Sequence, residues 1–548
     1  MTGVYARPGR GLTTQQCILV GKMLAIAMMH NTLPLSHLTL WRWISYTPHP
    51  VHHQSFFFML LLTIVLSLLA FRSLANLNVA FTSYYNDFIE PSYILGRSWS
   101  TTTVVAQQSI IQWADWLAAQ GPWSVTTSKP FPAPSNDMHD YLSWAIYFWP
   151  NCTGVGNATE LTPQQIWATC PYYRRDGEFN PDAFTVNNTG AFMAMSDAVL
   201  YNALAWAING SSKYATNVAS WIDTWFIAKD TYMNPNLNYG QVVRGPGKTS
   251  GMGRFMGVID LKCMVKVVNA VLVLRAGQAP GWTSAIDSGL VNWTKSYINW
   301  LTSSPIALAA AVARNNHGSY YYSQLAALQI LVNDTAGANA TIQKYFSSLY
   351  KNQISADGEQ PFEAVRTRSY HYRSFNIAAM ITNARLGSHL GFDAWNLTTS
   401  SGSTIKSALD FTMSILISLG ADNYSSSIEG STTMELLFLP SVGAGAVVYG
   451  AGDGQTRGRY VAFLESEEEN YPAQPWFFSN QPLDDSGWVG AHSESGGADA
   501  TTTSRAPTAS ASAGKGKGRN GGERVLLGSF GRQFLRAATL VSLHVLFV

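Results

Sequence analysis

Residues 286–301 read IDSGLVNWTKSYINWL, and their large apolar side chains recur at the spacing of one helix face: Ile286, Leu290, Trp293, Tyr297 and Leu301. The same period of 3.6 residues runs through 192–206 (FMAMSDAVLYNALAW) and 214–225 (YATNVASWIDTW). Such stripes are typical of amphipathic helices that bury one face in a core. Further helical windows follow at 261–275, 321–332, 341–351, 374–390 and 405–419.

Strand-like alternation is scarce between residues 81 and 464, and Gly/Pro/Asn clusters separate the helical windows. The pattern predicts an all-α domain over 81–464, with paired helices packed around a common axis and long polar loops at one end. The apolar stripes are interpreted as core rather than as cofactor sites.

The composition of the 548 residues excludes two broad classes of protein. Apolar residues make up 47% of the chain and charged residues 12%, with 18 Trp, 25 Tyr and 25 Phe, which is too apolar for a disordered protein. The formal net charge is +2, so the chain lacks the strong positive field of a nucleic-acid-binding protein. No nucleic-acid partner is expected.

The N-terminal segment 1–80 predicts export. Residues 56–71 form a dense apolar run that suits a secretory signal, and the small residues 73–75 follow it as a cleavage site. Because the run begins far from residue 1, two interpretations remain open. Either Met59 is the true start and residues 1–58 are an extension of the gene model, or the run is an uncleaved signal anchor.

The C-terminal segments predict a linker and a second targeting signal. Composition turns acidic and then rich in Ser, Thr and Gly after residue 464, which predicts a disordered linker over 465–522. Residues 523–548 end in an apolar tail, the layout of a GPI-anchor signal with attachment near Asn520. The alternative is a disordered tail that ends in a weak apolar patch.

The middle of the chain also suits a secreted or cell-surface glycoprotein. Acceptors for N-glycans occur at Asn151, Asn157, Asn187, Asn209, Asn292, Asn333, Asn339, Asn396 and Asn423. Cys152 and Cys170 bracket a short loop and are expected to form a disulfide in an oxidising compartment, whereas Cys263 is expected to be a buried thiol.

Three polar, aromatic loops stand out between the apolar helices: 137–150, 314–322 and 363–372. They hold Arg, Asn, His and Tyr, and they lack the sequence signatures of phosphate loops, zinc proteases and serine hydrolases. Such residues suit β-elimination on a uronic acid. Amide and guanidinium groups would neutralise the carboxylate so that the neighbouring C–H becomes acidic, and His or Tyr would move the protons. Aromatic residues such as Tyr147 and Trp149 would stack on sugar rings.

Five segments also resemble the alginate lyase superfamily of polysaccharide lyases in order and approximate spacing. They are MHDYLS and YFWP within 138–150, YRRDGEFNP at 173–181, NPNLNYGQ at 234–241, NNHG at 315–318 and RTRSYHY at 366–372. The resemblance covers roughly residues 95–450. It implies an (α/α) toroid, an incomplete α/α barrel, and cleavage of uronate polymers without a catalytic metal or other cofactor.

The resemblance also implies catalytic roles. Asn316 would neutralise the substrate carboxylate, and His317 would neutralise it or act as base, depending on the epimer. Tyr372 would be the general acid and, for syn elimination, the base, with Arg366 holding its phenol partly ionised. Tyr370 and Arg368 are alternatives to Tyr372 and Arg366. Further groove residues would be His139, Tyr147, Trp149, Asn238 and Gln241.

The leading hypothesis is therefore a lyase that acts on an anionic polysaccharide such as alginate or glucuronan. A glycoside hydrolase on the same toroid is the alternative enzyme; Asp137, Asp140 and Glu363 could supply its two carboxylates, but nothing in the sequence pairs them. The third hypothesis is a non-catalytic carbohydrate-binding surface protein.

Overall fold

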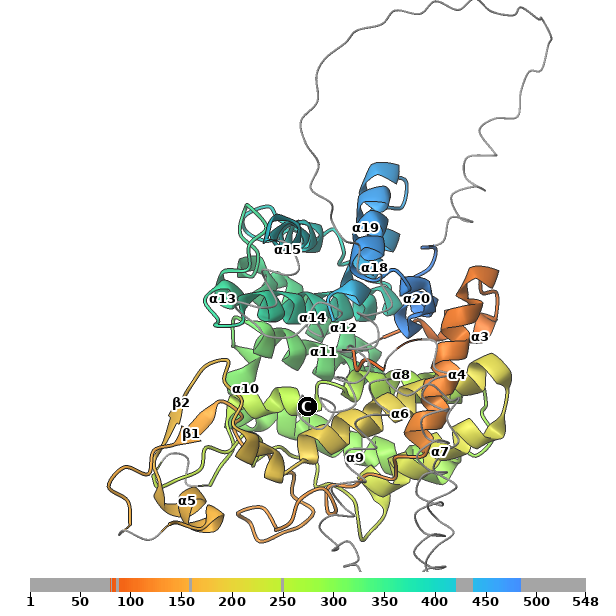
Figure 1. Cartoon of the computed structure of the whole chain (residues 1–548). Coiled ribbons are helices and arrows are strands. Elements are labelled where there is room, and N and C mark those ends of the chain that lie inside the picture. Colours follow the sequence, from red (N-terminus) through yellow and green to blue (C-terminus); the bar gives the residue numbers. More distant parts are fainter. Residues whose placement is uncertain are drawn as a thin grey trace, which may run out of the picture. The chain divides into compact units, whose positions relative to one another are not determined.

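The computed structural model describes residues 79, 81–84, 88–156, 160–247, 251–419 and 437–483, and they form an almost entirely helical domain (Figure 1). The helices of its first half are α3 (Pro91–Gly96), α4 (Val104–Ala118), α5 (Pro163–Thr169), α6 (Asn188–Asn209), α7 (Ser212–Ile222), α8 (Met264–Ala276) and α9 (Ser284–Ser303). Those of its second half are α10 (Pro305–Ala311), α11 (Asn316–Leu331), α12 (Thr335–Ser347), α13 (Pro361–Ala364), α14 (Ser369–His389), α15 (Ile405–Leu419), α18 (Leu439–Tyr449), α19 (Gly454–Glu467) and α20 (Pro475–Ser479).

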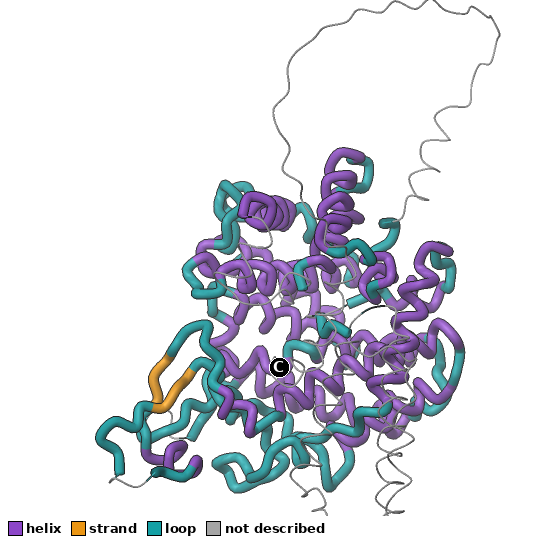
Figure 2. The backbone as a smooth tube through the Cα atoms, viewed as in Figure 1, coloured by secondary structure: helices purple, strands orange, loops and turns teal. Residues whose placement is uncertain are grey.

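The helices divide into an inner and an outer set. α6, α8, α11 and α14 pack successively against one another, while α7, α9, α12 and α15 each pack on the outside of an inner helix. Every residue of α11 is buried, and α6 and α14 are nearly as enclosed, whereas α7 and α9 bury one face. This inner and outer pairing confirms the expected all-α toroid, and Figure 2 shows how little of the described backbone is strand.

Polar side chains inside the inner helices bond across to their neighbours. Ser319 Oγ of α11 donates to Asn376 Oδ1 of α14 at 2.7 Å, and Gln324 accepts the Tyr297 hydroxyl of α9 at 2.6 Å. Buried polar groups need such partners, so these bonds fix which helices lie beside one another. α6 is long and apolar enough to cross a membrane by composition, but here it is a core helix.

Two short strands, β1 (Phe148–Pro150) and β2 (Tyr172–Arg174), form an antiparallel hairpin that lies with α5 beside the helices (Figures 1 and 2). Trp149 pairs with Tyr173 in its register. The disulfide Cys152–Cys170 links the hairpin's two arms, with the Cα atoms 4.9 Å apart. This disulfide was expected, as was the buried thiol of Cys263.

The expected linker start at residue 465 is wrong. α19 continues to Glu467, and α20 follows with Trp476, Phe477 and Phe478 buried against α4. The Tyr84 hydroxyl donates to Gln474 Oε1 at 2.8 Å, and the Tyr93 hydroxyl donates to the carbonyl of Phe478 at 2.7 Å. The folded domain therefore extends to residue 483. The expected signal, most of the linker and the anchor-like tail lie outside the described residues.

Candidate active site

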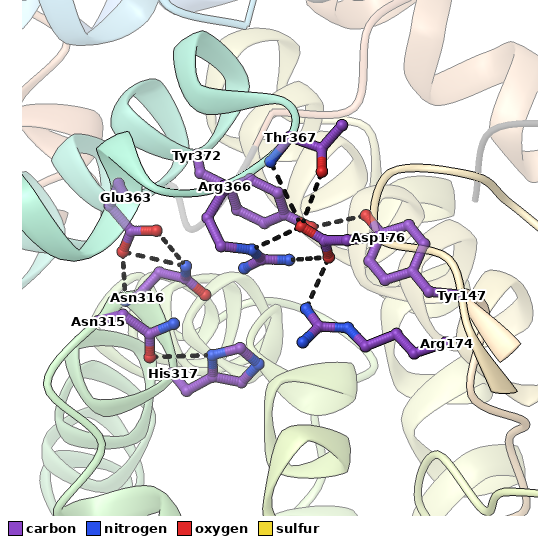
Figure 3. Close-up of polar contacts among 10 residues, drawn as sticks. All are labelled: Tyr147, Arg174, Asp176, Asn315, Asn316, His317, Glu363, Arg366, Thr367 and Tyr372. Carbon is purple, nitrogen blue, oxygen red and sulfur yellow. Dashed lines mark hydrogen bonds and ion pairs between the residues drawn. The ribbon is translucent and has the colours of Figure 1, made fainter.

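Residues from three parts of the chain converge at one end of α11 (Figure 3). Asn316 and His317 open α11, and Arg366 and Tyr372 come from the turn after α13 and the first turn of α14. The hairpin supplies Tyr147, just before β1, together with Arg174 and Asp176 at and after the end of β2. The two predicted catalytic pairs, Asn316–His317 and Arg366–Tyr372, therefore share one site.

Asn316 is fully buried and is held by Glu363 of α13. Its side-chain nitrogen lies 3.1 and 2.9 Å from the two carboxylate oxygens of Glu363, and its backbone N–H donates to Oε1 at 2.7 Å. Its own Oδ1 has no hydrogen-bond partner among the described residues. Burial raises the pKa of Glu363 to about 7, although its hydrogen bonds from Asn316 favour the carboxylate.

His317 is held as a neutral imidazole. Its Nδ1 lies 3.1 Å from Asn315 Oδ1, and its ring meets Phe255 edge to face. Burial lowers the pKa of His317 to about 3, and the positive charges of Arg366, Arg254 and Arg174 lower it further. At neutral pH this side chain can accept a proton.

Arg366 is fixed by Asp176 across the gap between α13 and the hairpin. Its Nε and Nη2 donate to the two carboxylate oxygens of Asp176 at 3.2 and 3.0 Å, and Arg174 donates to the same carboxylate at 2.6 Å. Burial disfavours the charge on Asp176, but Arg366, the backbone N–H of Thr367 and Arg174 together hold its pKa well below the usual range. Because of this lowered pKa, Asp176 stays ionised over ordinary pH.

Tyr372 is paired with a second phenol. Its hydroxyl lies 2.6 Å from that of Tyr147, and the guanidinium carbon of Arg366 sits 3.6 Å from the centre of its ring. Burial, and then Tyr147, raise the pKa of Tyr372 far above its usual value, and Arg366 only partly opposes them. The expectation that Arg366 keeps the phenol partly ionised is wrong for the free protein, because the hydroxyl is protonated and the cation faces the ring.

The alternatives to these two residues have other partners. Tyr370 is fully buried in the main core, edge-on to Phe438. Arg368 covers the ring of Phe179 with its guanidinium carbon 4.8 Å from the ring centre. The ring of Tyr147 stacks on the ring of Phe179, so it already has an aromatic partner in the place of the sugar ring that was predicted.

The remaining predicted groove residues serve mainly as supports. His139 bonds the carbonyl of Tyr232 at 2.6 Å and stacks on the same residue. Asn238 accepts the indole N–H of Trp300 at 2.8 Å. Trp149 donates to the carbonyl of Glu178 at 3.0 Å. None of these three has a described contact with the residues of Figure 3.

Gln241 supports a cation that the sequence did not single out. Its side chain donates to the buried Asp260 at 3.0 Å, and its carbonyl accepts from Arg254 Nε at 3.0 Å. Burial, and then the like charge of Arg174, lower the pKa of Arg254 to about 10, which still leaves it charged at neutral pH. The sequence pointed to Arg254 only indirectly, through the preceding NPNLNYGQ segment. The backbone carbonyl groups of Gly240 and Gln241 in that segment accept hydrogen bonds from Arg254.

Three guanidinium groups, those of Arg174, Arg254 and Arg366, therefore act on the surroundings of His317. They suit an anionic ligand, and a polar amide, a neutral imidazole and a protonated phenol lie among them. Within the residues that the structure describes, no group of three or more His, Cys, Asp or Glu side chains is placed to hold a metal ion.

The three carboxylates considered for a hydrolase lie in two separate sets of hydrogen bonds. Asp137 and Asp140 both accept from the side-chain amide of Asn234, at 2.8 and 2.9 Å, whereas Glu363 is bound to Asn316. Asp176, the other carboxylate drawn in Figure 3, is ion-paired with Arg366 and Arg174, and its lowered pKa makes it unsuitable as the general acid of a hydrolase.

Known proteins resemble this chain in sequence and in fold. The family model described as "Alginate lyase" matches residues 124–417, while no curated protein matches the chain. Among solved structures, an alginate lyase from Bacteroides ovatus is 27% identical with a TM-score of 0.61, covering 74% of this chain and all of that one. An alginate lyase from Sphingomonas species A1 is 15% identical with a TM-score of 0.35, covering 61% of this chain and 84% of that one.

The family match covers more than half of the chain and contains all the residues drawn in Figure 3. The helical toroid, the cationic site and the match to the Bacteroides enzyme agree with it. This chain belongs to the alginate lyase family and is a polysaccharide lyase.

Proposed function

We propose that the protein cleaves a β-linked uronate polymer such as alginate or glucuronan by β-elimination at the site of Figure 3. Asn316 and the guanidinium groups neutralise the uronate carboxylate, which makes the adjacent C5–H acidic. A base removes that proton, the electron pair forms the C4–C5 double bond, and the C4–O4 bond breaks. The leaving oxygen takes a proton from an acid.

The observation that carries this proposal is the convergence of Asn316, His317, Arg366 and Tyr372 at one end of α11 (Figure 3). His317 is neutral and can act as base, while Tyr372 is protonated and can act as acid. The uronate carboxylate adds a negative charge beside His317, which favours its protonated form. For syn elimination, Tyr372 would have to act both as base and as acid, and the hydroxyl of Tyr147 would donate a hydrogen bond to the Tyr372 phenolate.

Absorbance near 235 nm tests the proposal, because elimination leaves an unsaturated uronate and hydrolysis does not. The substrates are polymannuronate, polyguluronate, glucuronan and hyaluronan. Tyr372→Phe should lower kcat by about 10²–10⁴-fold with binding retained. Tyr350→Phe removes the same atom from a distant hydroxyl that donates to Leu397, and it should keep full activity. Absence of unsaturated product from every polymer would overturn the proposal.

We also propose that the protein is secreted or held at the cell surface and carries N-glycans. In support, the acceptor side chains Asn151, Asn187, Asn209, Asn292, Asn333 and Asn396 are exposed, and Cys152–Cys170 is an oxidised pair. Protein secreted from a eukaryotic host should lose mass on endoglycosidase treatment, and an unchanged mass would contradict the glycans. Release of surface protein by a phospholipase that cuts GPI anchors would test the anchor.

A further inference from the structure

The side-chain amide of Asn316 faces the wrong way for its proposed task. Its NH₂ group is turned toward Glu363, whose carboxylate oxygens lie 3.1 and 2.9 Å away. Its carbonyl oxygen is buried and has no partner among the described residues, an arrangement that destabilises the free protein. The amide therefore turns its buried acceptor, rather than its donors, away from Glu363.

A uronate carboxylate is also an acceptor, so it cannot bond to the amide oxygen. Reversing the amide would point its NH₂ at the substrate, but Asn316 Oδ1 would then face two acceptor oxygens of Glu363. That arrangement is stable only when Glu363 carries a proton and can donate it. One residue thus controls which end of the amide faces the substrate.

We propose that Glu363 is a positioning residue: it takes up a proton when the polyuronate binds, and the Asn316 amide then reverses to donate to the uronate carboxylate. This inference rests on the proposed function, which assigns Asn316 to that carboxylate. The proton comes from solvent and stays on Oε2, where it is donated to Asn316 Oδ1. Oε1 keeps accepting the backbone N–H of Asn316, now at 2.7 Å.

The surroundings of Glu363 set its pKa in the range where it can take up a proton on binding. The charged and titratable groups that act on it are Arg366, Arg373 of α14 and Tyr345 of α12, and the two arginines favour the carboxylate. Burial outweighs them and raises the pKa of Glu363 to about 7. A second carboxylate on the far side of the amide raises the pKa of Glu363 further, since like charges disfavour ionisation.

The direct test is proton uptake on binding, measured by titration calorimetry at pH 8 in buffers of different ionisation enthalpy. The protein is Tyr372→Phe, which is expected to bind while cleaving about 10²–10⁴-fold more slowly, and the probe is whichever polyuronate the wild type cleaves fastest. We expect uptake approaching one proton per site. Adding Glu363→Gln should remove that proton, because the Gln amide already donates to Asn316 Oδ1. Zero uptake by Tyr372→Phe alone overturns the inference, even if Glu363→Gln does not fold.

The pH dependence of kcat/KM is the second readout. Above pH 8, Glu363→Gln should exceed the wild type, whose activity declines as Glu363 ionises, whereas Glu363→Ala should lose at least tenfold at every pH. Glu90→Gln is the matched control, because Glu90 pairs with His389 at 2.9 Å, outside the residues of Figure 3, and should leave the profile in place. Equal profiles for wild type and Glu363→Gln overturn the inference. Failure of the wild type to cleave any polyuronate instead overturns the proposed function.

Discussion

Asp176 decides where the guanidinium group of Arg366 points. The carboxylate receives two bonds from Arg366, one from Arg174 and two from Thr367, so it gathers the hairpin and the start of α14 at one point. Such a half-buried carboxylate with several hydrogen bonds contributes more to the stability of the fold than an exposed ion pair does.

Asp176→Asn should therefore lower kcat/KM about tenfold or more and destabilise the fold by about 1–3 kcal/mol, because Arg366 loses its charged partner. The pKa of Asp176 is depressed, so this stabilisation is fully present above the unfolded pKa near 4 and is lost as pH falls toward the lower folded pKa. Denaturant melts between pH 7 and pH 3 measure it. Asp115→Asn, which breaks the exposed pair with Lys213, should change stability by less than about 0.5 kcal/mol.

His317 gives a separate prediction. Because burial lowers its pKa to about 3, its imidazole should stay neutral from pH 8 to pH 4 in the folded protein. The unfolded chain binds that proton near pH 6.5, so this residue makes the protein less stable as pH falls from 6.5 toward 3. Carbon-13 NMR of the imidazole, assigned with His317→Gln, reads the midpoint directly. A midpoint near 6.5 would contradict the burial seen here.

Part of the site could be predicted from the sequence, and the rest could not, because it depends on contacts made only in the folded chain. The NNHG and RTRSYHY motifs located the four central residues, and helix geometry separates Tyr370 from Tyr372, because positions two apart point to opposite sides. The roles of Glu363 and Arg254 depend on contacts between segments far apart in sequence. Asn316 and Glu363, for example, are 47 residues apart.

Among the elements, the outer helices α7, α9 and α15 and the inner helix α6 followed the predicted windows closely, whereas α11 and α12 began five and six residues before theirs. The stripe at 286–301 lies within α9, whose outer position leaves one face wet. α11 is buried on all sides, so its apolar and polar residues carry no period, and its window was placed five residues late. The hairpin was missed because strands of three residues are too short to show alternation.

The hairpin disulfide should matter for binding more than for chemistry. Cys152→Ser with Cys170→Ser frees an arm of 18 residues that carries Arg174 toward the site, and the entropic contribution of such a loop is about 3 kcal/mol. We expect a lower Tm and a raised KM, with kcat changed less. Calorimetry and the 235 nm assay measure both. Reductant should reproduce the effect in wild type and add nothing to the double variant.

For the whole domain, the change in composition at residue 465 proved a poor boundary. The acidic run there is the exposed end of α19, and the aromatic residues after it pack on α4. Their aromatic content was the available signal, since linkers rarely hold a Trp-Phe-Phe sequence.

Ending the chain after Leu483 should therefore preserve the fold and the activity, whereas ending it after Leu464 should not. The shorter chain loses Trp476, Phe477 and Phe478, and each buried aromatic contributes about 3–5 kcal/mol. Circular dichroism melts and the 235 nm assay compare the two proteins. Cooperative melting of the shorter chain at the full-length Tm would contradict the extended boundary.

The bonds from Tyr84 to Gln474 and from Tyr93 to Phe478 join residues about 390 positions apart. A nascent chain emerging from the ribosome at about 5–20 residues per second therefore waits roughly 20–80 seconds before its first helices meet their last partners. Throughout that interval the aromatic surface of α4 that α20 later covers is open to other molecules. Chaperones that bind apolar surface during translation would therefore act first on this exposed surface of α4.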